Sequence, residues 1–367
     1  MRRFPRRPSP AQITLAAGSV LLFVGVLRRV PLDQVGAALR GLALWQIVVL
    51  LALNALIALS FSGRWWLILR ALGQRVPYLR LSAHRLGAFG VSYFTPGTQF
   101  GGEPLQVYLI GEGHAVPLSA AITSVTLDKT IELLVNFSVL AAGVIILLLA
   151  QGTILPVILP GLAAHGALAF SALLLAAPTA FLAAVWAGAR PVGRFVALIT
   201  RVLGSADDPR VGWRARLAPA VMRAGEALSA VDELATAFFR HHPRAVVLAL
   251  IISVLSWIGM LAEYWLMAGF LGARLTLLQA TLALTAARVA FLLPLPGGLG
   301  VLEASQALAM SVLGFDAALG VSLALLIRGR DMLFGVIGLG WAAAEIRRLR
   351  SSEKRCKVAP HHEPSNE

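Results

Sequence analysis

The chain has 367 residues, of which 58% are hydrophobic and only 14% charged, and its mean hydropathy is +0.78. Soluble domains carry about 25% charged residues, so this composition excludes a soluble protein and predicts an all-α polytopic membrane protein. A membrane barrel is excluded because the apolar runs are continuous, without the alternation of a lipid-facing strand.

We predict about six transmembrane helices. The arginine-rich segment Met1–Pro10 precedes the first apolar run, which we interpret as an uncleaved span and not a signal peptide because no clean Ala-x-Ala site precedes Arg28-Arg29. Pro178 predicts a kink in the fourth span. The predicted spans are Ala11–Leu27, Leu44–Phe61, Ala120–Ala150, Ala167–Trp186, Val246–Leu271 and Ala317–Ile346.

Two further apolar segments are interrupted and predict re-entrant helical hairpins. Gly87–Tyr93 is apolar but stops at Pro96-Gly97, after too few residues to cross a bilayer, and Leu105–Ile110 resumes the apolar pattern. In the second segment Leu277–Leu293 breaks at 294–298 and Ala304–Leu313 follows. If each hairpin is instead a full span, the chain has eight spans.

The segment Arg190–Arg244 is rich in arginine and contains an apolar stripe at helical spacing. We interpret it either as an interfacial helix that gates or docks on the membrane domain, or as a helix that covers the cytoplasmic face. Pro243 ends it. The stripe consists of Leu217, Val221, Ala224, Leu228, Val231, Ala235 and Phe238.

The net charge of +14 is carried mainly by arginines at the ends of apolar windows, as in cytoplasmic loops. This rule places the N-tail (1–10), the segments Arg64–Arg85 and Arg190–Arg244, and the tail (347–367) in the cytoplasm of a bacterial-type inner membrane. The first half (about 44–150) and second half (about 246–346) are then inverted. Arg28, Arg29, Arg40 and Arg274 fall outside and oppose this topology.

The charge also bears on partners and metals. Anionic or modified lipid head groups are the expected partners, and nucleic acid is not. Cys356 is the single cysteine, so no intramolecular disulfide forms. The pairs His241-His242 and His361-His362 lie in polar stretches without a CxxC or HExxH motif, and we expect neither metal nor cofactor.

The two interrupted segments repeat each other. Pro96, Gly97 and Glu103 of the first recur in the same order and at the same mutual spacing as Pro296, Gly297 and Glu303 of the second. Upstream, Trp66-Leu67, Leu72-Gly73 and Arg75 recur as Trp265-Leu266, Leu271-Gly272 and Arg274. A duplicated helix break inside an apolar chain is typical of a transporter site between two halves.

The breaks supply the first candidate site residues. A half-helix that begins inside the membrane directs free N–H groups and its positive dipole end at a ligand, and glycine permits close approach, although a tight turn explains the same pattern. Glu103 and Glu303 either complement the helix dipole or act as a charged latch or proton carrier. The candidate glycines are Gly97, Gly101, Gly102, Gly297, Gly298 and Gly300.

Charged residues inside apolar windows complete the candidate site. Asp128 and Glu132 are four residues apart and share a helix face, and Arg328 and Asp331 are three apart and can pair with each other. These charges either form buried pairs that fix helix packing or line a path on which unpaired arginine meets phosphate. The candidate cations are Lys129, Arg288, Arg328 and Arg330.

At these motifs the chain resembles the membrane domain of lysylphosphatidylglycerol synthase/flippase proteins and their stand-alone relatives. The resemblance covers about residues 11–346, and the family typically has arginine where this chain has Lys129. It rests on Pro96-Gly97-x-x-x-Gly101-Gly102-Glu103, Thr126-Leu127-Asp128-Lys129, Pro296-Gly297-Gly298-Leu299-Gly300-Val301-Leu302-Glu303 and Leu326-Ile327-Arg328.

The resemblance implies movement of a phospholipid, glycolipid or hopanoid-type lipid between leaflets. Only residues 347–367 follow the last predicted span, so we expect no aminoacyl-transferase domain and no enzyme activity. No Walker motif is present. One alternative is a polyprenyl-phosphate-dependent glycosyltransferase, for which Asp207-Asp208 is the only Asp-Asp doublet; another is a scaffold for a lipid-modifying enzyme.

Overall fold

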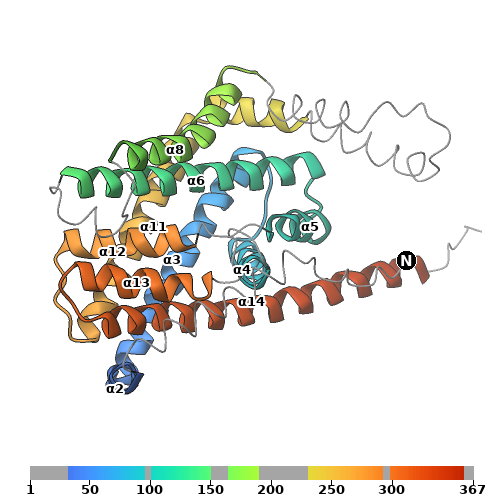
Figure 1. Ribbon diagram of the computed structural model, residues 1–367. Coiled ribbons are helices and arrows are strands. Elements are labelled where there is room, and N and C mark those ends of the chain that lie inside the picture. Colours follow the sequence, from blue (N-terminus) through green and yellow to red (C-terminus); the bar gives the residue numbers. More distant parts are fainter. Residues whose placement is uncertain (1–31, 96–100, 150–163, 190–229, 292–297, 359–367) are drawn as a thin grey trace, which may run out of the picture.

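The structure is a computed structural model that describes residues 32–95, 101–149, 164–189, 230–291 and 298–358. Within these ranges every regular element is helical and no strand occurs (Figure 1). Residues 230–241 are also helical. The helices with defined bounds are α2 (Leu32–Arg40), α3 (Leu44–Ala71), α4 (Tyr78–Phe94), α5 (Glu103–His114), α6 (Leu118–Leu149), α8 (Ala164–Trp186), α11 (Pro243–Phe270), α12 (Leu277–Ala290), α13 (Val301–Val312) and α14 (Ala317–Val358).

The described helices include two, α3 and α11, that are long and apolar enough to cross a membrane. Each has 28 residues and is therefore about 42 Å long, more than the ~30 Å of a hydrocarbon core. Their outer faces expose large apolar side chains such as Leu56 and Val254. Such an apolar surface is unfavourable in water, whereas the acyl chains of lipids can solvate it.

The order of helices repeats along the chain. A long helix, two short helices and another long helix form α3–α4–α5–α6, and α11–α12–α13–α14 repeat the series. The four helices begin at 44, 78, 103 and 118 in the first half and at 243, 277, 301 and 317 in the second. The distance along the chain between corresponding helices is therefore nearly constant, and it matches the distance between the repeated sequence motifs.

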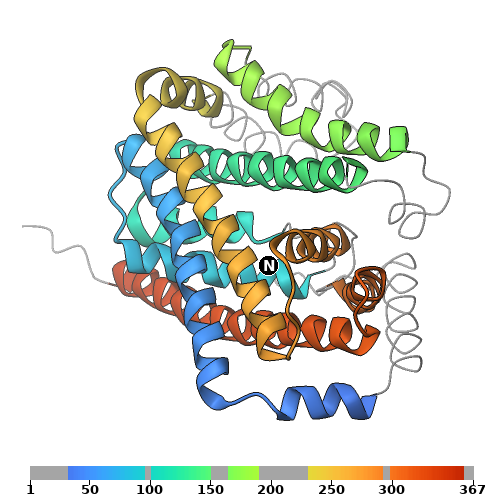
Figure 2. The same cartoon turned by 90° about the vertical axis from the view of Figure 1, so that its left-hand side faces the viewer.

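The corresponding helices α3 and α11 pack against each other in opposite directions (Figure 2). The hydroxyl oxygens of Ser60 and Ser256 are 2.6 Å apart, and towards the start of α3 the amide of Asn54 donates to Glu263 near the end of α11. Between these contacts Gly259 faces Ile57. Small residues let the two backbones approach, as membrane helices without a hydrophobic driving force require.

Helices α4 and α14 pack still more closely, also in opposite directions. A Cβ added at Gly90 would lie 2.5 Å from the carbonyl oxygen of Gly335, and Gly338 faces the carbonyl group of Leu86 with no room for a side chain. In the reciprocal contact between the halves, Gly143 of α6 in the first half faces Thr285 of α12 in the second. Each half therefore contributes one short helix, α4 or α12, that packs on a long helix of the other half.

The amphipathic helix α2 lies across the end of the bundle where α3 begins (Figures 1 and 2). Its buried residue Val35 packs on Ala318 and Val321 of α14. The contact joins the segment before the first half to the second half.

Several predicted boundaries need correction. The second span does not end at Phe61, because α3 continues to Ala71 and encloses Arg64. Helix α4 begins at Tyr78, so Arg85 is also helical and not part of a loop. Helix α14 continues past Ile346 into the segment assigned to the tail.

Other predictions concern positions inside helices or outside the described residues. Pro178 lies inside α8, which corresponds to the predicted fourth span. The first span, the doublet Asp207-Asp208 and most of the amphipathic stripe lie outside the described residues.

Candidate functional site

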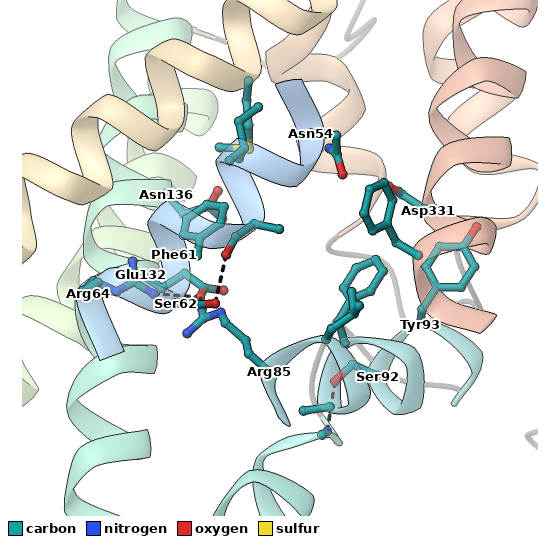
Figure 3. A pocket seen from close by; sticks show the side chains of 18 of the residues that line it. Asn54, Phe61, Ser62, Arg64, Arg85, Ser92, Tyr93, Glu132, Asn136 and Asp331 are labelled. Carbon is teal, nitrogen blue, oxygen red and sulfur yellow. Dashed lines mark hydrogen bonds and ion pairs between the residues drawn. The ribbon is translucent and has the colours of Figure 1, made fainter. Parts of the chain in front are cut away.

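A cavity of about 1010 Å³ lies between the two halves of the bundle. Its wall includes residues of α3, α4 and α6 from the first half and of α11, α12 and α14 from the second. Figure 3 shows charged residues of the first half on one side of the space, and Tyr93 and Asp331 on the other. The predicted site residues in the wall are Gly102, Glu103, Asp128, Lys129, Glu132, Arg288, Gly298, Arg330 and Asp331.

Two arginines share two carboxylates on the first-half side of the cavity. Arg64 is fully buried and donates to Asp128 at 2.7 Å and to Glu132 at 3.0 Å. Arg85 donates to the second oxygen of Asp128 and to Glu132 at 2.9 Å. The third donor of Arg64 reaches Ser253 of α11 at 3.0 Å. The predicted shared face of Asp128 and Glu132 is therefore confirmed, and it joins α3, α4 and α6.

Lys129 connects this cluster to the helix break. Its Nζ lies 3.0 Å from Glu132 and 3.7 Å from Glu103, the first residue of α5. Glu103 in turn accepts a hydrogen bond of 2.7 Å from the backbone N–H of Gly101. The carboxylate thus occupies free backbone donors that precede α5, as a dipole-complementing residue does.

A second cluster lies on α11 and α14. Arg330 is 2.6 Å from Glu263 and 2.8 Å from Asp331, and Asn54 of α3 also donates to Glu263 at 3.3 Å. Glu263 is 2% exposed, and its other oxygen is buried without a hydrogen-bond partner in the described part of the chain. A buried carboxylate with unused acceptor capacity, facing a cavity, is suited to a donor that enters from that cavity.

Glu303 and Arg328 form a pair behind the wall of the cavity. Arg328 donates to the two carboxylate oxygens at 2.7 and 3.1 Å, and Glu303 is fully buried. Glu303 also accepts from the backbone N–H of Gly300 at 2.9 Å. The predicted pairing of Arg328 with Asp331 is wrong, because Arg328 reaches Glu303 on α13 and Asp331 pairs with its neighbour Arg330.

Arg288 differs from the other arginines that line the cavity. Its guanidinium lies over the ring of Trp257, 5.3 Å from the centroid, and against the sulfur of Met260. Among the residues that the structure describes, no carboxylate lies within ion-pair distance of Arg288. The indole face gives a cation only modest stabilisation, so the guanidinium retains donors for an anion in the cavity.

The break glycines are only partly described. Pro96, Gly97, Pro296 and Gly297 lie outside the described residues. Gly102 and Gly298 both line the cavity, so residues next to the two breaks meet at one space. The N–H of Gly102 donates to Ser92 of α4 at 2.9 Å, and a Cβ at this position would overlap the backbone of Ala88. Gly102 thus holds the start of α5 against α4.

Sequence reasoning missed several residues that hold the site together. The sequence context of Arg64 and Arg85 predicts a basic cytoplasmic segment, yet the two side chains neutralise the carboxylates of α6. Glu263 is a lone carboxylate in an apolar span, and this was the signal in the sequence that could have identified it. Asn54 and Ser253, which also line the cavity, carried no comparable signal.

The sequence comparison decides the family. Residues 11–338 match the family described as the lysylphosphatidylglycerol synthase TM region. The chain belongs to this family. It is therefore a membrane protein related to lipid modification or flipping, and the cavity and its charges lie within the matched region. No curated protein matches the chain. Within the described residues no group of three or more metal-binding side chains occurs.

Proposed function

We propose that this protein is a lipid flippase or translocase that carries the head group of a phospholipid, glycolipid or hopanoid-type lipid between leaflets. The observation that carries the proposal is Arg288, a cation in the cavity wall with no carboxylate partner in the described residues. A phosphate or other anionic group of a lipid supplies the missing acceptor. The acyl chains remain in the bilayer, and the chain performs no covalent chemistry.

The surroundings of Arg288 support a head group of mixed polarity. Glu263 and Asp331 line the same cavity, and one oxygen of Glu263 is unpaired within the described residues. A head group that carries both an anion and hydroxyl or amine donors can bind Arg288 through the anion and Glu263 through a donor. The remaining wall includes apolar groups such as Leu284 and Phe334, which exclude water from the charged contacts.

We further propose that the short helices form re-entrant hairpins. Helices α4 and α5 have 17 and 12 residues and are about 26 and 18 Å long, so neither reaches across ~30 Å of hydrocarbon. Helices α12 and α13, of 14 and 12 residues, are about 21 and 18 Å long. Non-helical backbone at membrane depth is tolerated where it lines a polar cavity, and Gly102 and Gly298 do so.

The two halves are proposed to be related by an inverted repeat, with a pseudo-two-fold axis in the membrane plane. The opposed packing of the corresponding helices α3 and α11 supports this relationship. A two-fold operation that exchanges the halves also converts the α4–α14 contact into the α12–α6 contact, and glycines mediate both contacts. Inverted repeats of this kind bind substrate at the interface between repeats.

The arginine distribution supports an inner (cytoplasmic) membrane location with both termini in the cytoplasm. Membrane lipids are the proposed partners. A lipid-modifying enzyme becomes the expected protein partner only if the chain acts as a scaffold.

The test is a flipping assay with purified protein in liposomes that contain fluorescent phospholipids, in which a membrane-impermeant reductant reports the outer leaflet. The wild type should flip lipid, and Arg288→Gln should reduce the rate at least tenfold, since it removes a charge-assisted bond to the head group. Arg274→Gln is the matched control, because Arg274 is exposed in the loop before α12.

Two results would contradict the proposal. If the wild type flips none of the lipid classes tested, the scaffold alternative is favoured. If Arg288→Gln behaves like Arg274→Gln, transport does not depend on the unpaired cation.

A further inference from the structure

Two ion pairs occupy corresponding places in the two halves. Glu103 begins α5, and Glu303, its counterpart in the sequence repeat, lies in the first turn of α13. Their cations, Lys129 and Arg328, lie on the corresponding long helices α6 and α14. We call Glu103 with Lys129 the α5 pair, and Glu303 with Arg328 the α13 pair.

Each glutamate also accepts a hydrogen bond from a backbone N–H shortly before it, two residues back in the α5 pair and three residues back in the α13 pair. Glu103 accepts from the N–H of Gly101, and Glu303 accepts from the N–H of Gly300. Both glycines have positive φ, +132° and +80°, so each break turns through a conformation that favours glycine just before the carboxylate. Each pair therefore ties a helix break to the following long helix of its own half, and the two can be compared directly.

The pairs differ in how tightly they are closed. In the α13 pair the guanidinium meets both carboxylate oxygens, and Glu303 is 0% and Arg328 11% exposed. In the α5 pair the closest N–O distance is 3.7 Å, longer than a hydrogen bond, and the side chains of Glu103 and Lys129 are 25% and 20% exposed. Lys129 lies closer to Glu132, at 3.0 Å.

The cavity follows the same asymmetry. In the described part of the chain its wall includes both members of the α5 pair but neither member of the α13 pair. The polar space thus reaches residues beside both breaks, Gly102 and Gly298, but it contacts only the loose ion pair.

We infer that the α5 and α13 pairs are alternating gates of the cavity, and that the structure is one of two states. In this state the α13 pair is closed and the α5 pair is open; in the other state the two conditions are exchanged. Two halves of similar construction that adopt different conformations can exchange them at little cost in free energy, which opens the site to the opposite face. The inference rests on the proposed function only for what passes through the cavity.

The test uses substitutions at the two pairs. Lys129→Arg gives the α5 pair a guanidinium, which can contact both carboxylate oxygens as Arg328 does, and should stabilise the closed form of this pair. Arg328→Lys gives the α13 pair an ammonium group, which cannot make the bidentate contact of a guanidinium, and should loosen this pair. Both changes keep the charge and are expected to favour the second state. Glu103→Gln weakens the closed α5 pair and should favour the state described here.

The readout is access to the cavity from each face. Asn136 lines the cavity (Figure 3), so Asn136→Cys in a Cys356→Ser background serves as the reporter. An impermeant maleimide is applied to membrane vesicles of each orientation, and the ratio of the two labelling rates is measured. Lys129→Arg and Arg328→Lys should each shift this ratio in the same direction by roughly fivefold or more, and Glu103→Gln in the opposite direction.

Arg274→Lys, the same substitution type at an exposed loop position, is the control and should leave the ratio unchanged. The inference is overturned if Lys129→Arg and Arg328→Lys shift the ratio in opposite directions, or if either leaves it unchanged. The flipping assay keeps the two proposals separate. If the substitutions shift the labelling ratio but the protein moves no lipid, the gates are supported and transport is rejected. If the protein moves lipid but the substitutions leave the labelling ratio unchanged, the gates are rejected.

Discussion

Arg64 of α3 and Glu263 of α11 occupy corresponding positions in the two halves and carry opposite charges. Each side chain ties the first long helix of its half to the last one. Arg64 pairs with Asp128 and Glu132 of α6, and Glu263 pairs with Arg330 of α14. In both halves an ion pair therefore joins the first long helix to the last. The cation lies on the first long helix, α3, in one half and on the last, α14, in the other.

Loss of the Arg64 cation should destabilise the first half strongly. Arg64→Met keeps most of the apolar stem but leaves Asp128, which is 3% exposed, and Glu132 with one guanidinium fewer. Removing one partner from a buried ion pair costs about 3–5 kcal/mol. Because Arg85 still contacts both carboxylates, we expect the lower part of this range.

The free energy of unfolding is measured by titrating micelles with a denaturing detergent. Arg274→Met, at an exposed position, is the control. Equal stabilities of the two variants would show that Arg64 does not balance the carboxylates of α6.

Glu263→Gln should cost less than loss of Arg64. The substitution keeps an oxygen for Asn54 and the shape of the side chain, and Arg330 keeps its contact with Asp331. What is lost is the charge in the hydrogen bond to Arg330, for which about 1.5–3 kcal/mol is expected. The same unfolding titration is compared with Glu112→Gln, an exposed glutamate of α5. A stabilised Glu263→Gln protein would mean that this carboxylate is retained for function at the expense of stability.

The sequence predicted the helix breaks well because their signal is local. A proline followed by glycine favours a helix end, because proline lacks a backbone donor and glycine tolerates a positive φ. Helix α4 ends at Phe94, before Pro96, and α12 ends at Ala290, before Pro294. The recurrence of these motifs in the second half also predicted that residues of both halves meet, and Gly102 and Gly298 do line the same cavity. That this cavity is a transport site stays a prediction.

The partners of the buried charges were less predictable because pairing depends on tertiary packing. Arg328 and Asp331 have the spacing of a local helix pair, yet Arg328 contacts Glu303, which the close packing of α13 on α14 brings within reach. Arg64 has the sequence context of a residue that follows a span. Arg64 is buried because it pairs with Asp128 and Glu132, which are 64 and 68 residues away in the sequence. No local sequence pattern reveals such distant partners.

The packing of α4 on α14 should tolerate no side chain at Gly338. A Cβ there meets the backbone carbonyl of Leu86, which cannot rotate away, so Gly338→Ala should destabilise the protein by about 1–3 kcal/mol. Gly340, two residues later on the same helix, has nothing within 4 Å of an added Cβ. Gly340→Ala should be neutral or stabilise by up to about 1 kcal/mol through helix propensity. Equal effects of the two substitutions in the unfolding titration would contradict the close approach of these helices.

The corresponding cations Lys129 and Arg328 should differ in their contribution to stability. Arg328→Gln leaves Glu303, which is fully buried, with no cation within ion-pair distance in the described residues, and should cost about 3–5 kcal/mol. Lys129→Gln leaves Glu103 partly exposed to the cavity and Glu132 with two arginines, so about 0–1 kcal/mol is expected. Adding Glu303→Gln to Arg328→Gln should restore much of the lost stability, because the unpaired buried charge is removed. If the double variant is no more stable than Arg328→Gln alone, the large cost arises from lost packing of the arginine side chain and not from the ion pair.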